Sequence, residues 1–120
     1  MQAIKKFMLI GQHYKIYPSI CAVKRQKSDS SYLSFAGDGL SIAWTFSLNG
    51  ITPKQRDEYC RKLTDIALAY NGRTYLAKHP YFAKDDFHGM YPDYKIVLEM
   101  KKKHDPDCLF LSRATQRLLL

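Results

Sequence analysis

The residue types best suited to chemistry gather around a lysine in the second half of the chain. In Gly72-Arg-Thr-Tyr-Leu-Ala-Lys78, residues 73–77 have the composition of a strand, and Lys78 stands where that strand would end. A lysine ammonium in this place can hold a substrate oxygen through charge-assisted hydrogen bonds. Lys24, near the end of an earlier predicted strand, has the same capacity. From spacing alone, ordinary exposed lysines are the alternative interpretation of both residues.

Other kinds of site find less support in the sequence. His79, Asp85, Asp86 and His88 are of metal-binding types, but their spacing matches no helical zinc motif and no cysteine is adjacent, so no metal site is predicted. The sequence contains no Gly-x-Ser-x-Gly elbow, no Gly-x-Gly-x-x-Gly fingerprint and no P-loop. It therefore carries no recognisable nucleophile motif and no phosphate cradle of its own.

Residues 40–48 alternate more clearly than any other segment and are predicted to form a strand. The side chains of one face are large and apolar, which predicts that this face packs on the core: Leu40, Ile42, Trp44, Phe46 and Leu48. The side chains of the other face are small: Ser41, Ala43, Thr45 and Ser47. A solvated outer face is one interpretation of this row, although such faces usually carry long polar side chains. The other interpretation is a surface against which a flat group lies.

The remaining patterns place helices around a small sheet. We expect strands at 19–25, 40–48 and 73–77, and helices at 2–16, 53–70, 84–88, 92–103 and after Ser112. Thr52, Pro53 and Gln55 form a capping-box start, and Gly72 is the expected helix end. The order predicts an α+β fold, with an antiparallel sheet of about three strands, helices packed on one face and a helical C-terminal segment. The Trp44 face should take the helices, which leaves the Ser41 face open.

Composition limits the class of protein. The chain has 120 residues, 46% of them hydrophobic, and a mean hydropathy of −0.37, which fits one globular domain without a membrane span. Three cysteines without a close pair fit a reducing cytoplasm. The net charge of +8 fits an anionic partner, such as nucleic acid, as well as a merely basic protein.

Four ordered motifs carry a resemblance to a known family. They are Tyr75-Leu-Ala-Lys78, Phe87-His-Gly-Met-Tyr-Pro92, Lys102-Lys-His-Asp-Pro106, and Phe110-Leu-Ser112 continuing to Arg117-Leu118. This set resembles the C-terminal end of FAD-linked oxidoreductases of the vanillyl-alcohol-oxidase type. The branches most similar to it are decaprenylphosphoryl-ribose oxidase and the aldonolactone or alditol oxidases. The resemblance is specific over residues 71–118 and looser over 18–48.

The resemblance implies roles for five residues. Lys78 matches a catalytic lysine that points at both flavin and substrate. Tyr75 matches an aromatic residue of the same motif, and Lys24 matches a strand lysine that lines the sugar pocket. Ser41 and Ala43 match positions that are Asn and Cys in the ribose oxidase, on the strand that lies over the flavin. Tyr75, Lys24 and Ser41 are thus expected to bind substrate, and Ala43 and Lys78 to contact FAD.

The resemblance also implies a second domain. In this family an FAD-binding domain precedes the substrate, or cap, domain, so we expect such a domain in cis or from a neighbouring gene. Alone, residues 1–120 are then expected to be an inactive substrate-domain fragment of an oxidoreductase that acts on a sugar, alditol or sugar-lactone alcohol group. The alternative is a stand-alone basic module that binds nucleic acid or protein and has lost catalysis. Self-association through the exposed sheet face is a further possibility.

Overall fold

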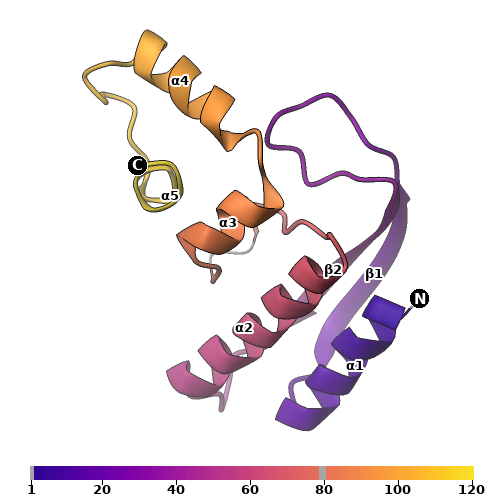
Figure 1. The fold of residues 1–120 in the computed structure, drawn as a ribbon. Coiled ribbons are helices and arrows are strands. Elements are labelled where there is room, and N and C mark those ends of the chain that lie inside the picture. Colours follow the sequence, from indigo (N-terminus) through magenta and orange to yellow (C-terminus); the bar gives the residue numbers. More distant parts are fainter. Residues whose placement is uncertain (1, 79–80) are drawn as a thin grey trace.

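The computed structural model describes residues 2–78 and 81–120, and Figure 1 shows their arrangement. The elements in chain order are α1 (Gln2–Tyr14), β1 (Pro18–Gln26), β2 (Gly39–Phe46), α2 (Pro53–Ala69), α3 (Lys84–Met90), α4 (Tyr94–His104) and α5 (Arg113–Leu118). The described residues thus form an α+β fold of five helices and a two-stranded antiparallel sheet, which confirms the predicted class. His79 and Pro80, expected to end a third strand, lie outside the described residues.

The two strands form a regular hairpin with one irregularity, between Pro18 and Ile20. The pairing runs from Pro18 opposite Phe46 to Gln26 opposite Gly39. Directly opposed residues in an antiparallel pair share a face of the sheet. One face therefore carries the partners Cys21 and Trp44 together with Val23 and Ile42. The other carries Ala22 and Ala43 together with Lys24 and Ser41.

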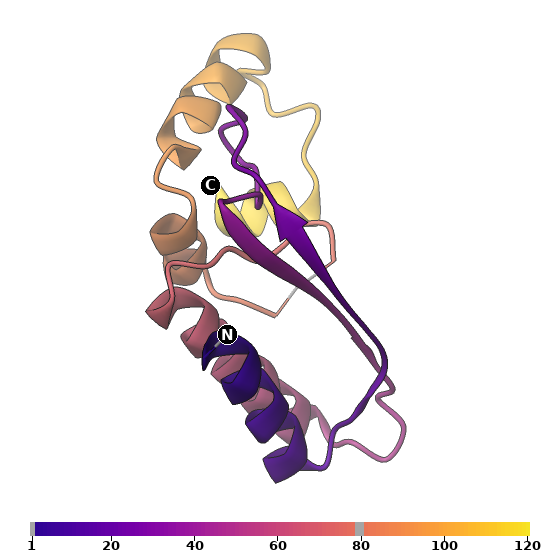
Figure 2. The same ribbon diagram turned by 90° about the vertical axis from the view of Figure 1, so that its right-hand side faces the viewer.

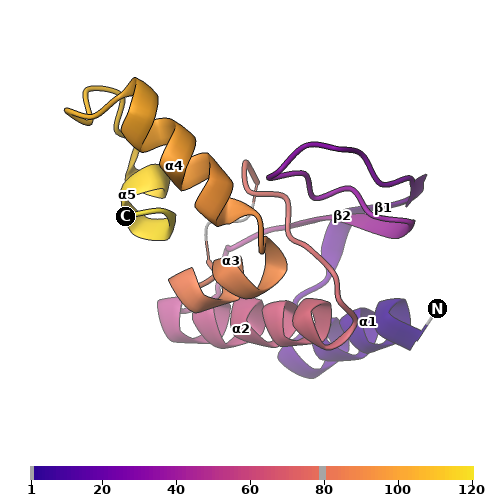
Figure 3. The ribbon, with the colours of Figure 1, turned by 45° about the horizontal axis from the view of Figure 1, so that its top comes forward.

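The Trp44 face of the hairpin is turned toward α1 and α2, as predicted. The Trp44 ring lies 6.5 Å from the Phe7 ring of α1, and Phe46 meets Tyr59 of α2 edge-on at 5.2 Å. Figures 2 and 3 show both helices on the same side of the strands. On the opposite face Ala43 is exposed. Trp44 and Phe46 thus pack on the helices as predicted, whereas Leu40 and Leu48, predicted to pack with them, are 50% and 44% exposed at the two ends of the predicted strand.

The strand predicted at 73–77 is wrong. Residues 72–75 are irregular and residues 76–78 form a turn, so the sheet has two strands in the described part of the chain. A short run with strand composition becomes a strand only where it meets the edge of another. Here the Thr74 carbonyl instead accepts a hydrogen bond from the Tyr91 hydroxyl, and the Lys78 N–H donates to the Tyr75 carbonyl at 3.0 Å.

Helix α2 begins and ends through local signals. At its start Thr52 and Gln55 exchange the two hydrogen bonds of a capping box, with Pro53 in the first turn, as predicted. At its end Asn71, rather than Gly72, takes the left-handed conformation, with φ of 53°. The Gly72 N–H donates to the Ala67 carbonyl at 2.7 Å. A Cβ at Gly72 would lie 3.0 Å from that oxygen, so the chain leaves the helix through a position that favours glycine.

The buried side chains form two separate groups. The sheet cluster consists of Ile16, Tyr59 and Cys60, between α1, α2 and the hairpin. The C-terminal cluster consists of Phe82, Phe87, Met90, Tyr91 and Leu118. Within the described part of the chain, no helix is long and apolar enough to cross a membrane.

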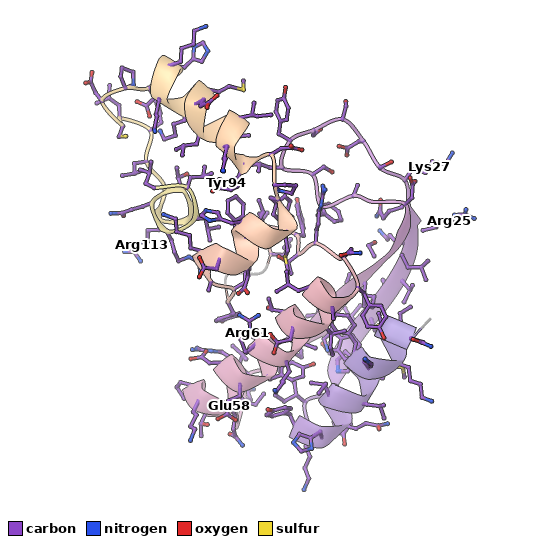
Figure 4. All side chains as sticks on the ribbon, in the orientation of Figure 1. Arg25, Lys27, Glu58, Arg61, Tyr94 and Arg113 are labelled. Carbon is purple, nitrogen blue, oxygen red and sulfur yellow. The ribbon has the colours of Figure 1, made fainter. Side chains whose placement is uncertain are left out.

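Arg61 joins the two parts of the molecule. This α2 residue donates to Asp86 of α3 across 2.6 Å, and Figure 4 shows Arg61 between the two helices. The C-terminal helices are thereby tied to the helix that supports the sheet.

Candidate functional site

An open cleft of about 1210 Å³ lies among the hairpin, α1, α2 and residues 72–78, which we call the lysine segment. Its lining includes residues from both faces of the hairpin, since Trp44 of the helix-facing side lines it as well as Ala43 of the other side. All five residues singled out from the sequence line it: Lys24, Ser41, Ala43, Tyr75 and Lys78. Pockets for small molecules typically measure roughly 300–1,000 Å³. The cleft therefore has room for more than a single sugar ring.

Lys24 and Ser41 come together because they are cross-strand partners. Their Cα atoms are opposed in the hairpin, so both side chains stand on the same face. The side-chain amide of Gln26 donates to Ser41 Oγ at 3.0 Å. Because that hydroxyl oxygen already accepts a bond, its own proton remains available to a ligand. Lys24 is exposed and extends the polar end of this face.

Ala43 lies on the same face, two residues along β2, and Ala22 stands opposite it. Two methyl groups at neighbouring positions make a low, flat surface without long side chains. Such a surface fits one side of a flat ring. In contrast, no glycine-rich loop opens onto α2, the longest described helix, which begins with its own Thr52 cap. The described residues therefore offer a flat apolar surface, and the start of α2 offers no glycine-rich loop for phosphates.

Lys78 lies in the turn that ends the lysine segment. Its side chain is exposed, and among the described residues it forms no ion pair. The turn is closed by the bond from the Lys78 N–H to the Tyr75 carbonyl. The ammonium is thus carried by an ordered backbone turn and remains able to bind an oxygen atom in the cleft.

Tyr75 is held by the loop between the strands, residues 27–38. Its ring packs against Phe35 with centroids 4.7 Å apart, and 48% of the residue stays exposed. Next to it, Arg73 donates to the Ser34 carbonyl at 2.8 Å. Phe35, Arg73 and Tyr75 all line the cleft. Sequence patterns did not single out Phe35 or Arg73, because neither contact follows from spacing along the chain.

The loop that carries Phe35 is stabilised by its own carboxylates. Asp29 accepts hydrogen bonds from the Ser34 hydroxyl at 2.7 Å and from the Ser31 N–H at 2.9 Å. These bonds, the Ser34 bond most of all, hold the pKa of Asp29 below its usual value. Asp38 likewise accepts from the Ser28 hydroxyl. The loop therefore has a defined shape where it meets Tyr75.

Tyr91 is a residue of the site region whose position sequence patterns did not foresee. It is fully buried, and its hydroxyl donates to the Thr74 carbonyl within the lysine segment. Burial raises the pKa of its phenol to about 12. The guanidinium of Arg73 lies 5.6 Å from the centre of the Tyr91 ring. The only signal for this residue was its place in the Met90-Tyr-Pro92 motif.

The side chains of metal-binding type serve other purposes. Burial tends to raise the pKa of Asp86, but hydrogen bonds from Arg61 and the Ala83 N–H outweigh it and hold that pKa below its usual value. His88 stacks flat on Tyr94, with ring centroids 3.9 Å apart. In residues 2–78 and 81–120, no three His, Cys, Asp or Glu side chains gather as a metal site would require. His79 lies outside these ranges.

Comparison with known proteins identifies the family. The family model described as D-arabinono-1,4-lactone oxidase matches residues 1–118, whereas no curated protein matches the chain. The matched range contains both strands, all the described helices and the whole cleft. It agrees with the resemblance to FAD-linked aldonolactone oxidases that the motifs around Lys78 carry. The chain belongs to the D-arabinono-1,4-lactone oxidase family, a family of oxidoreductases of the aldonolactone oxidase type.

Proposed function

We propose that this chain is the substrate-facing portion of an FAD-dependent oxidoreductase that oxidises an alcohol group of a sugar, an alditol or a sugar lactone. The family match supports the reaction class. The observation that carries the proposal is that Lys24, Ser41, Ala43, Tyr75 and Lys78 all line the same cleft. These residues come from both strands and from the lysine segment, and they combine two ammonium groups with a flat apolar surface.

Lys78 is the proposed catalytic residue. Bound FAD supplies the acceptor for the hydride that leaves the C–H bond of the alcohol. The Lys78 ammonium donates a hydrogen bond to the alcohol oxygen, which fixes the reacting carbon in place. The hydroxyl proton of the alcohol passes to water in the open cleft, and the same positive charge stabilises the negative charge that develops on the oxygen as that proton leaves. The backbone hydrogen bond between Tyr75 and Lys78 supports this role, because it closes the turn from which the lysine side chain reaches the cleft.

The other residues are proposed to bind and orient. The Ser41 hydroxyl, which accepts from Gln26, donates its proton to a substrate hydroxyl, and Lys24 donates to a neighbouring one. Tyr75, braced by Phe35, gives the sugar an aromatic wall. Ala43 contacts the flat face of the flavin ring. Together with Lys78, it forms the flavin side of the substrate pocket.

The rest of the cofactor is proposed to be held by a partner domain. The described residues offer a flat surface for the ring but no glycine-rich loop for the phosphates. We therefore assign FAD binding to a domain in cis or from a neighbouring gene, and we expect residues 1–120 alone to be inactive. In a titration of the isolated chain with FAD, we expect no saturable quenching of flavin fluorescence. Tight binding would overturn this division of the enzyme.

The role of Lys78 is tested in the FAD-loaded enzyme that contains this chain. Lys78→Ala should slow substrate-dependent flavin reduction, followed by anaerobic stopped-flow absorbance, by a factor on the order of 10². Lys62→Ala is a matched control, because Lys62 is an exposed lysine of α2 that does not line the cleft. An unchanged rate in Lys78→Ala would show that the assigned role is wrong.

Two accompanying features belong to the same proposal. Cys21, Cys60 and Cys108 are all free, which supports a reducing, cytoplasmic location.

The exposed Ala43 face is proposed to pair with a second copy of the chain when no partner domain covers it. Sedimentation equilibrium of the isolated chain should then give a mass above that of a monomer, and Ala43→Arg should reduce it. A monomer at all concentrations would contradict pairing.

A further inference from the structure

The lysine segment is irregular, so something other than a sheet must fix the position of Lys78. We propose that Tyr91 is a positioning residue for Lys78: its buried phenol holds the carbonyl of Thr74 and so sets the path of the chain that carries Tyr75 and Lys78. The consequence for catalysis rests on the proposed function. That Tyr91 holds the lysine segment in place is argued from the contacts alone.

Tyr91 has the properties of a fixed anchor. The residue is fully buried, and its ring lies 5.3 Å from that of Phe87 within the C-terminal cluster. Its own N–H donates to the Phe87 carbonyl at 2.9 Å, which fastens its backbone to the end of α3. A phenol held at both its ring and its backbone has little freedom to follow a moving partner. The hydroxyl therefore constrains the chain that it binds.

Thr74 is the point at which the lysine segment meets that anchor. Its carbonyl accepts the Tyr91 hydrogen bond, and its hydroxyl lies 3.5 Å from Met90 Sδ. The next residue, Tyr75, opens the turn that its carbonyl closes with the Lys78 N–H. The anchor thus lies one residue before the turn. A shift of Thr74 is passed directly to the residues that face the cleft.

Several other contacts of the segment involve exposed groups or lie at its first residue. Arg73 reaches the Ser34 carbonyl in an exposed contact, and Phe35 packs on the half-exposed Tyr75. At the start of the segment, the Gly72 N–H is bound to the Ala67 carbonyl. Within the described residues, the hydrogen bond from the Tyr91 hydroxyl to the Thr74 carbonyl thus joins the segment to a fully buried residue. It is also kept over the working pH range, since burial raises the Tyr91 pKa to about 12.

The position of Lys78 matters because its proposed role is to orient the alcohol oxygen of the substrate. A displacement of about 1 Å in a group that orients a substrate can reduce the rate by roughly 10². Tyr91 itself does not line the cleft, so it acts on the reaction only through the segment it holds.

The contact is tested first without any reaction. Tyr91→Phe removes the hydroxyl and keeps the buried ring. Tyr94→Phe is the matched control, because the Tyr94 ring stacks on His88 and packs against the same cluster. In hydrogen exchange of the full chain, the Lys78 amide, which is bonded to the Tyr75 carbonyl, should exchange about fivefold faster in Tyr91→Phe, the effect of losing one hydrogen bond. Its exchange should be unchanged in Tyr94→Phe. Equal exchange in both variants would overturn the proposal.

A second variant guards against loss of the fold. Leu118→Val loosens the same buried cluster and keeps the Tyr91 hydroxyl. If Tyr91→Phe also speeds exchange of the amides of α3, the two variants are compared under conditions that give equal exchange in α3. The Lys78 amide should then exchange faster in Tyr91→Phe than in Leu118→Val, and equal exchange would overturn the anchor.

The catalytic consequence is tested by a double-mutant cycle in the FAD-loaded enzyme. Tyr91→Phe should lower kcat on the order of tenfold, more than it alters KM. In the Lys78→Ala background, the same change should have almost no further effect, because the residue it positions is gone. Additive effects would show that Tyr91 does not act through Lys78. If Lys78→Ala alone leaves the rate unchanged, the proposed function fails, while hydrogen exchange still decides the contact.

Discussion

The two ends of the molecule are built in different ways. In the N-terminal part, a long hairpin and two long helices share a sheet cluster of three buried residues, and much of β1 and β2 is exposed. The C-terminal part has shorter helices around five buried residues, three of them aromatic. The N-terminal part exposes much of its sheet to the cleft and to solvent, and the C-terminal part holds buried side chains that fix the neighbouring chain in place. The lysine segment runs between them, which explains how an irregular chain can carry a functional group.

The largest expected effect comes from a substitution in the C-terminal cluster. Phe87→Ala should lower the free energy of unfolding by about 3–5 kcal/mol, because Phe87 is 1% exposed in the C-terminal cluster. Phe110→Ala, at a residue that is 84% exposed, should change it by less than about 0.5 kcal/mol. Urea denaturation measures both. If the clusters are separate units, amides of α3 in Phe87→Ala should exchange before those of the hairpin; simultaneous exchange would show a single unit.

The link between the two ends should give a smaller, pH-dependent effect. The folded-state pKa of Asp86 is depressed, so its contribution is present at neutral pH and is lost as the pH falls below its unfolded value, near 3.8. Asp86→Asn should lower stability at pH 7 by about 1–2 kcal/mol, the size of a partly exposed hydrogen bond to a charged group.

The measurement for Asp86 is the difference between the wild type and Asp86→Asn, followed by urea denaturation from pH 7 to pH 3. That difference should shrink as the carboxylate takes up its proton. Asp65→Asn is the matched control, since Asp65 accepts from the same Arg61 but is exposed. A constant difference over the whole pH range would mean that the ion pair with Arg61 does not link the two ends.

The N-terminal caps of α2 and α5 allow the two parts of the molecule to be compared by single substitutions. Thr52→Ala removes the capping box of α2, the 17-residue helix that supports the sheet, and should destabilise the protein by about 1 kcal/mol. Ser112→Ala removes a similar side-chain cap from α5, a helix of six residues near the chain end. It should have less effect, because terminal helices fray. Thermal unfolding by circular dichroism ranks the two variants; an equal loss would make α5 as important as α2.

The smallest effect is expected from the basic surface. Residues 1–28 contain Lys5, Lys6, Lys15, Lys24, Arg25 and Lys27 and no Asp or Glu. Figure 4 shows Arg25 and Lys27 projecting outward at the end of the hairpin. On the oxidoreductase proposal, single-stranded RNA should be retained weakly at low salt and released at physiological salt, as in non-specific binding. Retention at physiological salt, measured by fluorescence anisotropy, would favour the nucleic-acid-binding alternative.

Local patterns predicted local structure well. Alternation in residues 40–48 identified Trp44 and Phe46 as packing on α1 and α2, because side chains in a strand alternate wherever the strand lies, but it did not foresee that Leu40 and Leu48 are exposed. Thr52, Pro53 and Gln55 predicted the start of α2, because a capping box is closed within four residues. The cross-strand pairing of Lys24 with Ser41 needed the register of the hairpin, which the sequence pattern did not specify.

Nonlocal contacts account for what the sequence did not predict. Residues 73–77 have strand composition, yet the Thr74 carbonyl is bound by a side chain 17 positions away. No sequence pattern in the segment predicts Tyr91 as the partner of this carbonyl. Phe35 and Arg73 were overlooked for the same reason, since their contacts join the loop 27–38 to the lysine segment. The family resemblance pointed to the five residues along the cleft, but not to what holds them there.

The hydrogen bond between Tyr91 and Thr74 has a reciprocal consequence. A ligand that binds more tightly when the lysine segment is ordered must stabilise that ordered state by the same free energy. The C-terminal cluster does not line the cleft, yet it holds the donor of this bond. The thermal stability of the C-terminal helices would then depend on whether the cleft is occupied, although the buried residues of that cluster do not themselves line the cleft.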